Sequence, residues 1–115
     1  MNMCSFDDFK NIKLVIGKIM EAERVERSEK LLNLKVDLGE RDEEGKPRFR
    51  EILSGIGKVY IPDELLGREV VVVSNLEPRS LMGVESQGML LATSDESGIV
   101  LLRPERDVTP GSSVS

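Results

Sequence analysis

One stretch, residues 70–93, limits the possible folds more than any other part of this chain. It opens with four consecutive valines and closes with a second apolar run at residues 89–92. Short β-branched and aliphatic runs bounded by turn residues are typical of buried strands. The segment between the two runs is polar and contains Pro78 and Gly83. The stretch therefore predicts two packed strands that present a mixed loop, and binding residues often lie on such loops.

The first half of the chain has the pattern of a bent strand followed by a hairpin. Residues 13–25 are rich in apolar side chains, but their alternation fails at Gly17, and a glycine inside a strand often marks a bulge or bend. The next strand alternates clearly, and its inward residues are Leu32, Leu34, Val36 and Leu38. The alternation places Asn33 and Lys35 on the outer face of this strand. The polar residues 39–47 predict a hairpin loop.

The remaining segments add a third strand at residues 48–54, a short helix, and a last strand at residues 99–102. The helix begins at Pro62 and ends at Gly67, because proline favours the first turn of a helix and glycine its end. The tally of about five strands, with a helix between the third and fourth, is the connectivity of an OB barrel. We therefore expect an all-β, five-stranded OB-fold barrel with short helices and a C-terminal extension, and one domain over residues 1–115.

A short helical turn is expected near the N-terminus, over residues 6–12. Ser5 can cap this turn, and the acidic residues that follow suit the positive end of a helix. Phe6 and Phe9 lie three residues apart, so they share one side of the turn. We expect these two rings to close the bottom of the core.

The OB connectivity indicates where a ligand would bind. OB barrels bind through the outer face of the second and third strands and through the loops that join the first strand to the second and the fourth to the fifth. On this sequence the first of these loops carries Arg24, Arg27 and Lys30, and the second spans residues 77–87. Phosphate groups are contacted mainly by lysine and arginine, and the candidates for such contacts are Lys30, Lys35, Lys58 and Arg79.

The residue inventory leaves little for catalysis. The chain has no histidine and a single cysteine, so Ser-His and Cys-His nucleophile pairs are impossible and a structural zinc site is not indicated. Residues 54–58 suggest a phosphate-binding loop, but Ile52 stands where the first glycine is needed and Val59 follows Lys58 in place of serine or threonine. We expect no enzyme activity, no metal and no cofactor.

Charge and hydropathy restrict the partners and the location. The net charge of -5 argues against an indiscriminate nucleic-acid binder, although several of the acids fall together in the expected loop at 39–47. No apolar run approaches the roughly 20 residues that span a bilayer, and the N-terminus lacks the apolar core of a signal peptide. With Cys4 unable to form an intrachain disulfide, we expect a cytoplasmic protein without membrane association.

Residues 75–92, NLEPRSLMGVESQGMLLA, resemble the signature loop of the tRNA-binding domain family. The resemblance continues over FKNIKLVIGKIMEAER, SEKLLNLKVDLG and ILSGIGKVYIPDELLGREVVVVSNL, and so covers nearly the whole chain. This domain occurs in the methionyl-tRNA synthetase β subunit, as a stand-alone dimeric tRNA-binding protein, at the end of human-type synthetase cofactors and in bacterial phenylalanyl-tRNA synthetase.

The resemblance implies a non-catalytic protein or subunit that binds folded tRNA, equivalent to the β subunit or C-terminal domain of a methionyl-tRNA synthetase, with the catalytic chain of that synthetase as a partner. The positions that match the family's tRNA-contact residues are Lys30, Ser86 and Met89, with Asn75, Arg79 and Met82 nearby. Together with the barrel placement, the candidate tRNA-binding residues are Lys30, Asn33, Lys35, Lys58, Asn75, Arg79, Met82, Ser86 and Met89. Residues 25–29 depart from the family's usual His-Pro-Asn-Ala-Asp run, which predicts a first loop of different shape.

Two other readings stay open. The segment VLLRPERDVTPG resembles a CsaA-like export chaperone, which has the same barrel and binds unfolded peptides, but residues 86–90 keep a Ser-x-Gly-Met-Leu pattern that the chaperones usually lack. A purely structural dimerisation subunit would require no basic patch.

A homodimer is expected because the apolar run at residues 99–102 and the tail residues Val108 and Val114 have no obvious place in so small a barrel. Contiguous exposed apolar surface usually marks an interface.

Overall fold

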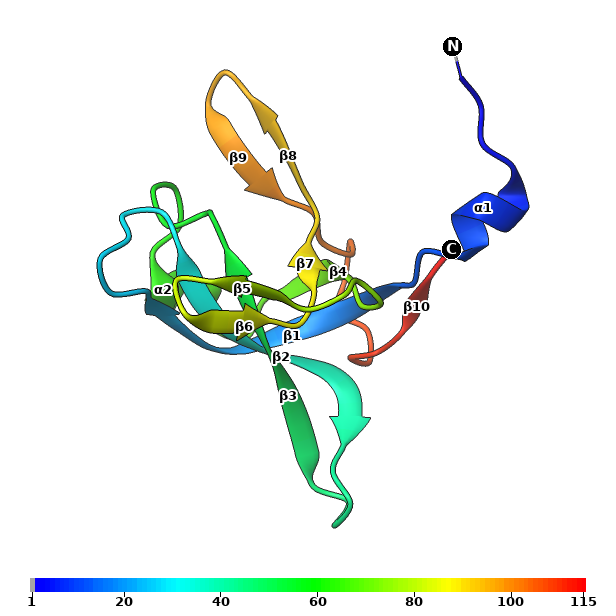
Figure 1. The fold of residues 1–115 in the computed structure, drawn as a ribbon, viewed down its shortest axis with the longest axis horizontal. Coiled ribbons are helices and arrows are strands. Elements are labelled where there is room, and N and C mark those ends of the chain that lie inside the picture. The colour runs from blue at the N-terminus through cyan, green and yellow to red at the C-terminus, as the bar shows by residue number, and fades with distance from the viewer. Residues whose placement is uncertain (1) are drawn as a thin grey trace.

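The computed structural model describes residues 2–115, and Figure 1 shows a curled β-sheet with a projecting two-stranded arm and an N-terminal helix outside it. The main sheet has the strand order β3-β2-β1-β4-β7, with β10 paired to β1. The elements are α1 Phe6–Lys10, β1 Leu14–Arg24, β2 Leu32–Arg41, β3 Pro47–Ser54, α2 Pro62–Leu65, β4 Glu69–Val73, β5 Arg79–Leu81, β6 Val84–Ser86, β7 Met89–Leu90, β8 Ala92–Asp95, β9 Gly98–Leu101 and β10 Ser113–Val114.

Strand β1 pairs with a different neighbouring strand along each half of its length. Its first half pairs with β4 and its second half with β2, and both pairings are antiparallel. A Cβ at Gly17 would lie 2.6 Å from side-chain atoms of Leu38 and Val36, so the glycine lets the sheet fold closely onto itself. The register shifts between Ile19 and Glu21, a short way beyond the bend expected at Gly17. The predicted bent first strand is therefore confirmed, with its bulge placed slightly later.

The core lies inside the curl and is built by alternate residues of the strands. The predicted inward residues Leu32, Leu34, Val36 and Leu38 are all buried, which confirms the alternation in β2. They pack with buried residues from the other elements, namely Ile19, Ile52, Ile56, Leu65, Val70, Val72 and Leu90. Each such side chain stabilises the fold by roughly 1.5–3 kcal/mol relative to an exposed position.

Hydrogen bonds connect β3 to residues 86 and 87, which end the β5–β6 hairpin and precede β7. The Leu53 amide donates to Ser86 Oγ at 2.9 Å, and the Gln87 amide donates to the Glu51 carbonyl at 2.8 Å. The strand order ends at β7 without a ladder back to β3, so the sheet is a curled half-barrel. The expected all-β, OB-like fold is confirmed.

Two expected details are wrong. The segment at residues 77–87 is not an open loop but contains the β5–β6 hairpin. Phe6 and Phe9 do not close the core, because α1 lies outside it and these side chains are 72% and 39% exposed. The strand expected at residues 99–102 is β9, which pairs with β8 in the projecting arm. No helix among residues 2–115 is long and apolar enough to cross a membrane.

Candidate nucleic-acid interface

The first loop, residues 25–31, is a tightly closed turn between β1 and β2. The Val25 amide donates to the Leu31 carbonyl and the Ser28 amide donates to the Val25 carbonyl, both at 3.1 Å. The Leu31 amide donates to Ser28 Oγ at 3.1 Å. Arg27 has a backbone φ of 68°, a conformation that residues other than glycine rarely adopt. The loop is therefore held by its own bonds, with Arg27 exposed at its tip.

The glycine-rich segment at residues 55–57 supports this first loop. The Gly57 amide donates to the Lys30 carbonyl at 2.7 Å, and Arg24 Nη1 donates to the Gly57 carbonyl at 2.8 Å. A Cβ at residue 57 would lie 2.9 Å from the Lys30 oxygen, so only glycine allows this approach. The segment that suggests a phosphate loop in the sequence thus has its backbone engaged with the first loop.

The β5–β6 hairpin faces the first loop across a hollow. Its strands are joined by Met82 and Gly83, which have φ values of 52° and 79°, as in a two-residue type I′ turn. Ser86 anchors the hairpin base, because its buried hydroxyl accepts from the Leu53 amide and donates to the Gly88 carbonyl at 3.2 Å. The base of the β5–β6 hairpin is therefore held in place, and its tip presents Met82, which is 55% exposed.

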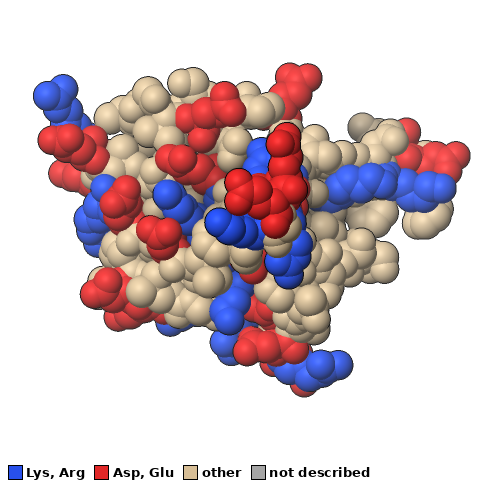
Figure 2. Space-filling model, turned by 90° about the horizontal axis from the view of Figure 1, so that it is seen from below, with Lys and Arg blue, Asp and Glu red and all other residues tan. Residues whose placement is uncertain are grey.

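The hollow between these two segments measures about 640 Å³. It is lined by residues 23–27 of β1 and the first loop, by Asn33 of β2, and by Met82 and Val84 of the hairpin. Its size falls within the roughly 300–1,000 Å³ of typical ligand sites. Two arginines and two glutamates line it, so its charges balance. Figure 2 shows the same mixture on the face that it views, where basic and acidic side chains are interspersed.

Asn33 and Lys35 lie on β2 as predicted, beside this hollow. Asn33 Nδ2 donates to Glu51 Oε1 at 2.8 Å, while Asn33 Oδ1 is buried and has no hydrogen-bond partner. Lys35 is exposed and lines a smaller adjacent hollow together with Asn33 and Glu21. The outer face of β2 therefore carries the exposed cationic side chain of Lys35 next to the hollow.

The remaining basic candidates lie around the same end of the fold. Lys30 is exposed in the first loop, and Lys58 Nζ lies 3.9 Å from Glu29 Oε2, an exposed pair that contributes little stability. Arg79 lines a separate groove with Met89, Gly55 and Thr93, and Met89 is 40% exposed. The structure thus brings Lys30, Asn33, Lys35 and Met82 to one hollow and its surroundings, and places Arg79 with Met89 in a second groove.

Two candidate side chains are hydrogen-bonded to other parts of the chain, Asn75 at the surface and Ser86 in the interior. Asn75 Oδ1 accepts from the Lys13 amide at 2.9 Å, and Asn75 Nδ2 donates to the Asn11 carbonyl at 2.6 Å. Ser86 is 4% exposed and bonded as described above. Asn75 therefore ties the end of β4 to the N-terminal segment, and Ser86 holds the hairpin base. Their place among the tRNA contacts stays a prediction.

Arg50 is a site residue that the sequence analysis missed. Its Nε and Nη2 donate to the two carboxylate oxygens of Glu40 at 2.9 and 2.8 Å. Its Nη1 donates to the carbonyls of Ser74 and Gln87, which flank the hairpin segment. The Arg50 hydrogen bond lowers the pKa of Glu40, against a smaller opposing effect of burial. No local pattern distinguishes Arg50 from the other basic residues, since its partners come from three distant segments.

Comparison with known proteins identifies the family. Residues 14–113 match the model of the family described as "Putative tRNA binding domain". The chain belongs to this tRNA-binding domain family. It is 44% identical over 111 residues to the methionine–tRNA ligase of Caldanaerobacter subterraneus subsp. tengcongensis, covering 96% of this chain but 16% of that protein. This chain therefore spans about a sixth of the length of such relatives.

Two solved structures share the fold over nearly their full length. The "MetRS related protein" of Pyrococcus horikoshii superposes with a TM-score of 0.87 at 34% identity, covering all of both chains. The chaperone CsaA of Bacillus anthracis str. Ames superposes with a TM-score of 0.82 at 28% identity, covering 99% of this chain and 100% of that one. Among residues 2–115, no group of acidic or cysteine side chains could hold a metal ion.

Proposed function

We propose that residues 1–115 form one non-catalytic tRNA-binding domain that binds folded tRNA through the first loop, the outer face of β2 and the segment at residues 74–88. The observation that carries the proposal is the meeting of the first loop and the β5–β6 hairpin around one hollow. These two segments and β2 are the ligand-binding elements of OB barrels. The family match over residues 14–113 adds the class of ligand.

Basic side chains around the hollow supply the contacts to phosphate. Arg27, Lys30 and Lys35 are exposed near it, and Lys58 and Arg79 extend the surface on either side. Each is exposed, so each can reach an RNA backbone without leaving a buried charge unpaired. Nearby glutamates reduce the net positive charge, which favours binding to a defined RNA shape over binding to any polyanion.

The similarity to methionine–tRNA ligases suggests the setting of this function. We infer that the domain acts beside a methionyl-tRNA synthetase catalytic chain, where it raises the local concentration of tRNA, and that it does so in the cytoplasm. Aminoacylation would then belong to the catalytic chain.

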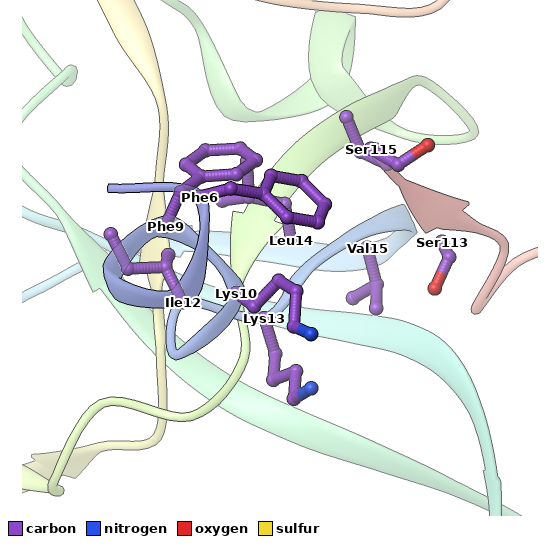
Figure 3. A pocket seen from close by; sticks show the side chains of 10 residues that line it. Phe6, Phe9, Lys10, Ile12, Lys13, Leu14, Val15, Ser113 and Ser115 are labelled. Atoms are coloured by element: carbon purple, nitrogen blue, oxygen red, sulfur yellow. The ribbon is translucent and has the colours of Figure 1, made fainter. Parts of the chain in front are cut away.

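A homodimer is part of the proposal, as expected from the sequence, but we place its contact at α1, the start of β1 and β10 and not at the apolar run of residues 99–102. Figure 3 shows the hollow between α1, the start of β1 and β10, with Phe6, Phe9 and Leu14 beside the C-terminal residues. Ile12 is 49% exposed beside them. A second copy that brings the same patch forms a closed two-fold contact and buries both apolar surfaces. Two copies would offer a large folded RNA two sets of binding loops.

A second function is favoured by one observation, the full-length match to chaperone CsaA structures. On that reading the same surface binds unfolded peptide. A gel-shift titration with folded tRNA, repeated with an excess of unfolded peptide, separates the two functions. The proposal expects a shift at micromolar protein and low salt that the peptide does not reverse, whereas the absence of a shift at low salt contradicts tRNA binding.

A further inference from the structure

The hollow between the first loop and the β5–β6 hairpin is lined by two non-glycine residues whose backbone is left-handed. Within residues 2–115, Arg27 and Met82 are the non-glycine residues with positive φ, and both line this hollow from opposite sides. The left-handed conformation brings Cβ close to the following carbonyl oxygen, so it is unfavourable for these residues. Strain of this kind tends to persist where a ligand site requires it.

The side chain of Asn33 gives an independent observation in the same hollow. A carboxylate only accepts hydrogen bonds, so the Glu51 carboxylate requires Asn33 to direct its Nδ2 toward it. Asn33 Oδ1 is then left as a buried acceptor without a donor, the only such side-chain atom found among the described residues. Buried acceptors nearly always have a donor, so the site lacks a group that a ligand could supply.

The other lining residues indicate the shape and chemistry of that ligand. Glu23 and Glu26 add acceptors, and the site therefore favours a group that carries several N–H donors. Met82 and Val84 provide an apolar wall, and the unbranched thioether of methionine adapts to a flat ring. Asn33 Oδ1 is covered in this structure, so we infer that a ligand reaches it when a side chain at the rim of the hollow changes rotamer; Met82, which is 55% exposed, is the candidate for this change.

We propose that this hollow is a subsite for one unstacked nucleobase that carries an exocyclic amino group, namely adenine, cytosine or guanine in preference to uracil. The proposal rests on the proposed function and names the part of the RNA that the domain reads. The amino group donates to Asn33 Oδ1, the ring lies against Met82, and the arginines of the rim approach the flanking phosphates. Uracil has one N–H between two carbonyl oxygens. These oxygens accept hydrogen bonds and would face the acceptors of the site, which is unfavourable. Unstacked bases of this kind occur in RNA loops.

The test uses labelled single-stranded RNAs of about eight nucleotides, within the site size of an OB fold. Oligo(A), oligo(C) and oligo(U) are titrated by fluorescence anisotropy with the full chain and with folded tRNA in parallel. The unaltered protein should bind oligo(A) and oligo(C) about three- to tenfold more tightly than oligo(U), as expected for one added hydrogen bond.

Three variants separate the contacts. Asn33→Leu removes the acceptor and should abolish the preference over oligo(U). Met82→Asn supplies the residue that a type I′ turn favours, so it should raise the melting temperature while weakening binding to all three RNAs. Met3→Asn is the matched control, because Met3 is 90% exposed and does not line the hollow, and it should bind like the unaltered protein.

Equal affinity for the three RNAs, or a preference that survives in Asn33→Leu, would overturn the base subsite while tRNA binding still stands. Unchanged affinity in Met82→Asn would place the RNA elsewhere and overturn it as well. If the protein binds neither tRNA nor the short RNAs, both the proposed function and this subsite are overturned.

Discussion

Replacement of Arg50 by alanine is the perturbation whose effect follows most fully from the contacts. The variant loses two hydrogen bonds to backbone carbonyls, at Ser74 and Gln87, each worth about 1 kcal/mol. It also loses the two-bond ion pair between Arg50 and Glu40. The side chains of Arg50 and Glu40 are 23% and 37% exposed, so the loss of this pair lowers stability by about a further 0.5–1 kcal/mol. We therefore expect the free energy of unfolding to fall by about 2–4 kcal/mol.

Urea unfolding of Arg50→Ala, Arg50→Lys and Arg48→Ala measures this loss. Lysine keeps the charge but cannot form the planar fork, so Arg50→Lys should be intermediate. Arg48 is an exposed neighbour on the same strand, and its removal should change stability by about 0.5 kcal/mol or less. If Arg50→Ala loses no more stability than Arg48→Ala, the inferred clamp on the hairpin segment does not exist.

The same clamp predicts a pH dependence. Because Arg50 lowers the pKa of Glu40 below its ordinary value of 4.5, the pair stabilises the fold above that value. This contribution disappears as pH falls from 4.5 through the folded-state pKa. The difference in unfolding free energy between Arg50→Ala and the unaltered protein should therefore narrow on acidification. A constant difference from neutral to acidic pH would contradict the assignment to Glu40.

Four further substitutions test the fold, the interface and the dimer. Gly17→Ala should lose about 1–3 kcal/mol in urea unfolding, because its Cβ would overlap Leu38 and Val36; no loss would show that the sheet can relax there. Lys30→Ala and Arg79→Ala should each weaken tRNA binding with melting temperatures nearly unchanged, and unaltered binding by both would place the RNA on another face. Phe9→Glu should give a monomer in sedimentation equilibrium at micromolar concentration, whereas a persistent dimer would contradict the α1–β10 interface.

The sequence predicted the main sheet because its signals are local. Alternation in β2 and the valine run of β4 each follow from side-chain periodicity, and these strands contain much of the core. The hairpin turn was missed because Met82-Gly83 lacks the Asn-Gly or Asp-Gly signal of a type I′ turn. The methionine at this position is informative, because asparagine adopts the positive φ of a type I′ turn at a lower energetic cost.

The position of the candidate site could be predicted in outline from the sequence, but its internal hydrogen bonds could not, and its tRNA contacts stay a prediction. Lys30 and Asn33 follow from the placement of an OB barrel on the sequence, which depends only on element order. The bonds of Asn75 and the clamp of Arg50 join residues that are far apart in the chain, and no local pattern carries such information. The same holds for Phe6 and Phe9, because periodicity shows that they share a side but not what that side faces.

The most direct test of the central claim is the affinity for folded tRNA, measured by fluorescence anisotropy at several salt concentrations. Phosphate contacts release counterions, so the logarithm of the association constant should fall linearly with the logarithm of salt concentration. Between three and five exposed basic side chains around the hollow predict a slope of about -2 to -5, and Lys30→Ala should reduce its magnitude by about one. No binding at low salt, or a slope near zero, would contradict the account.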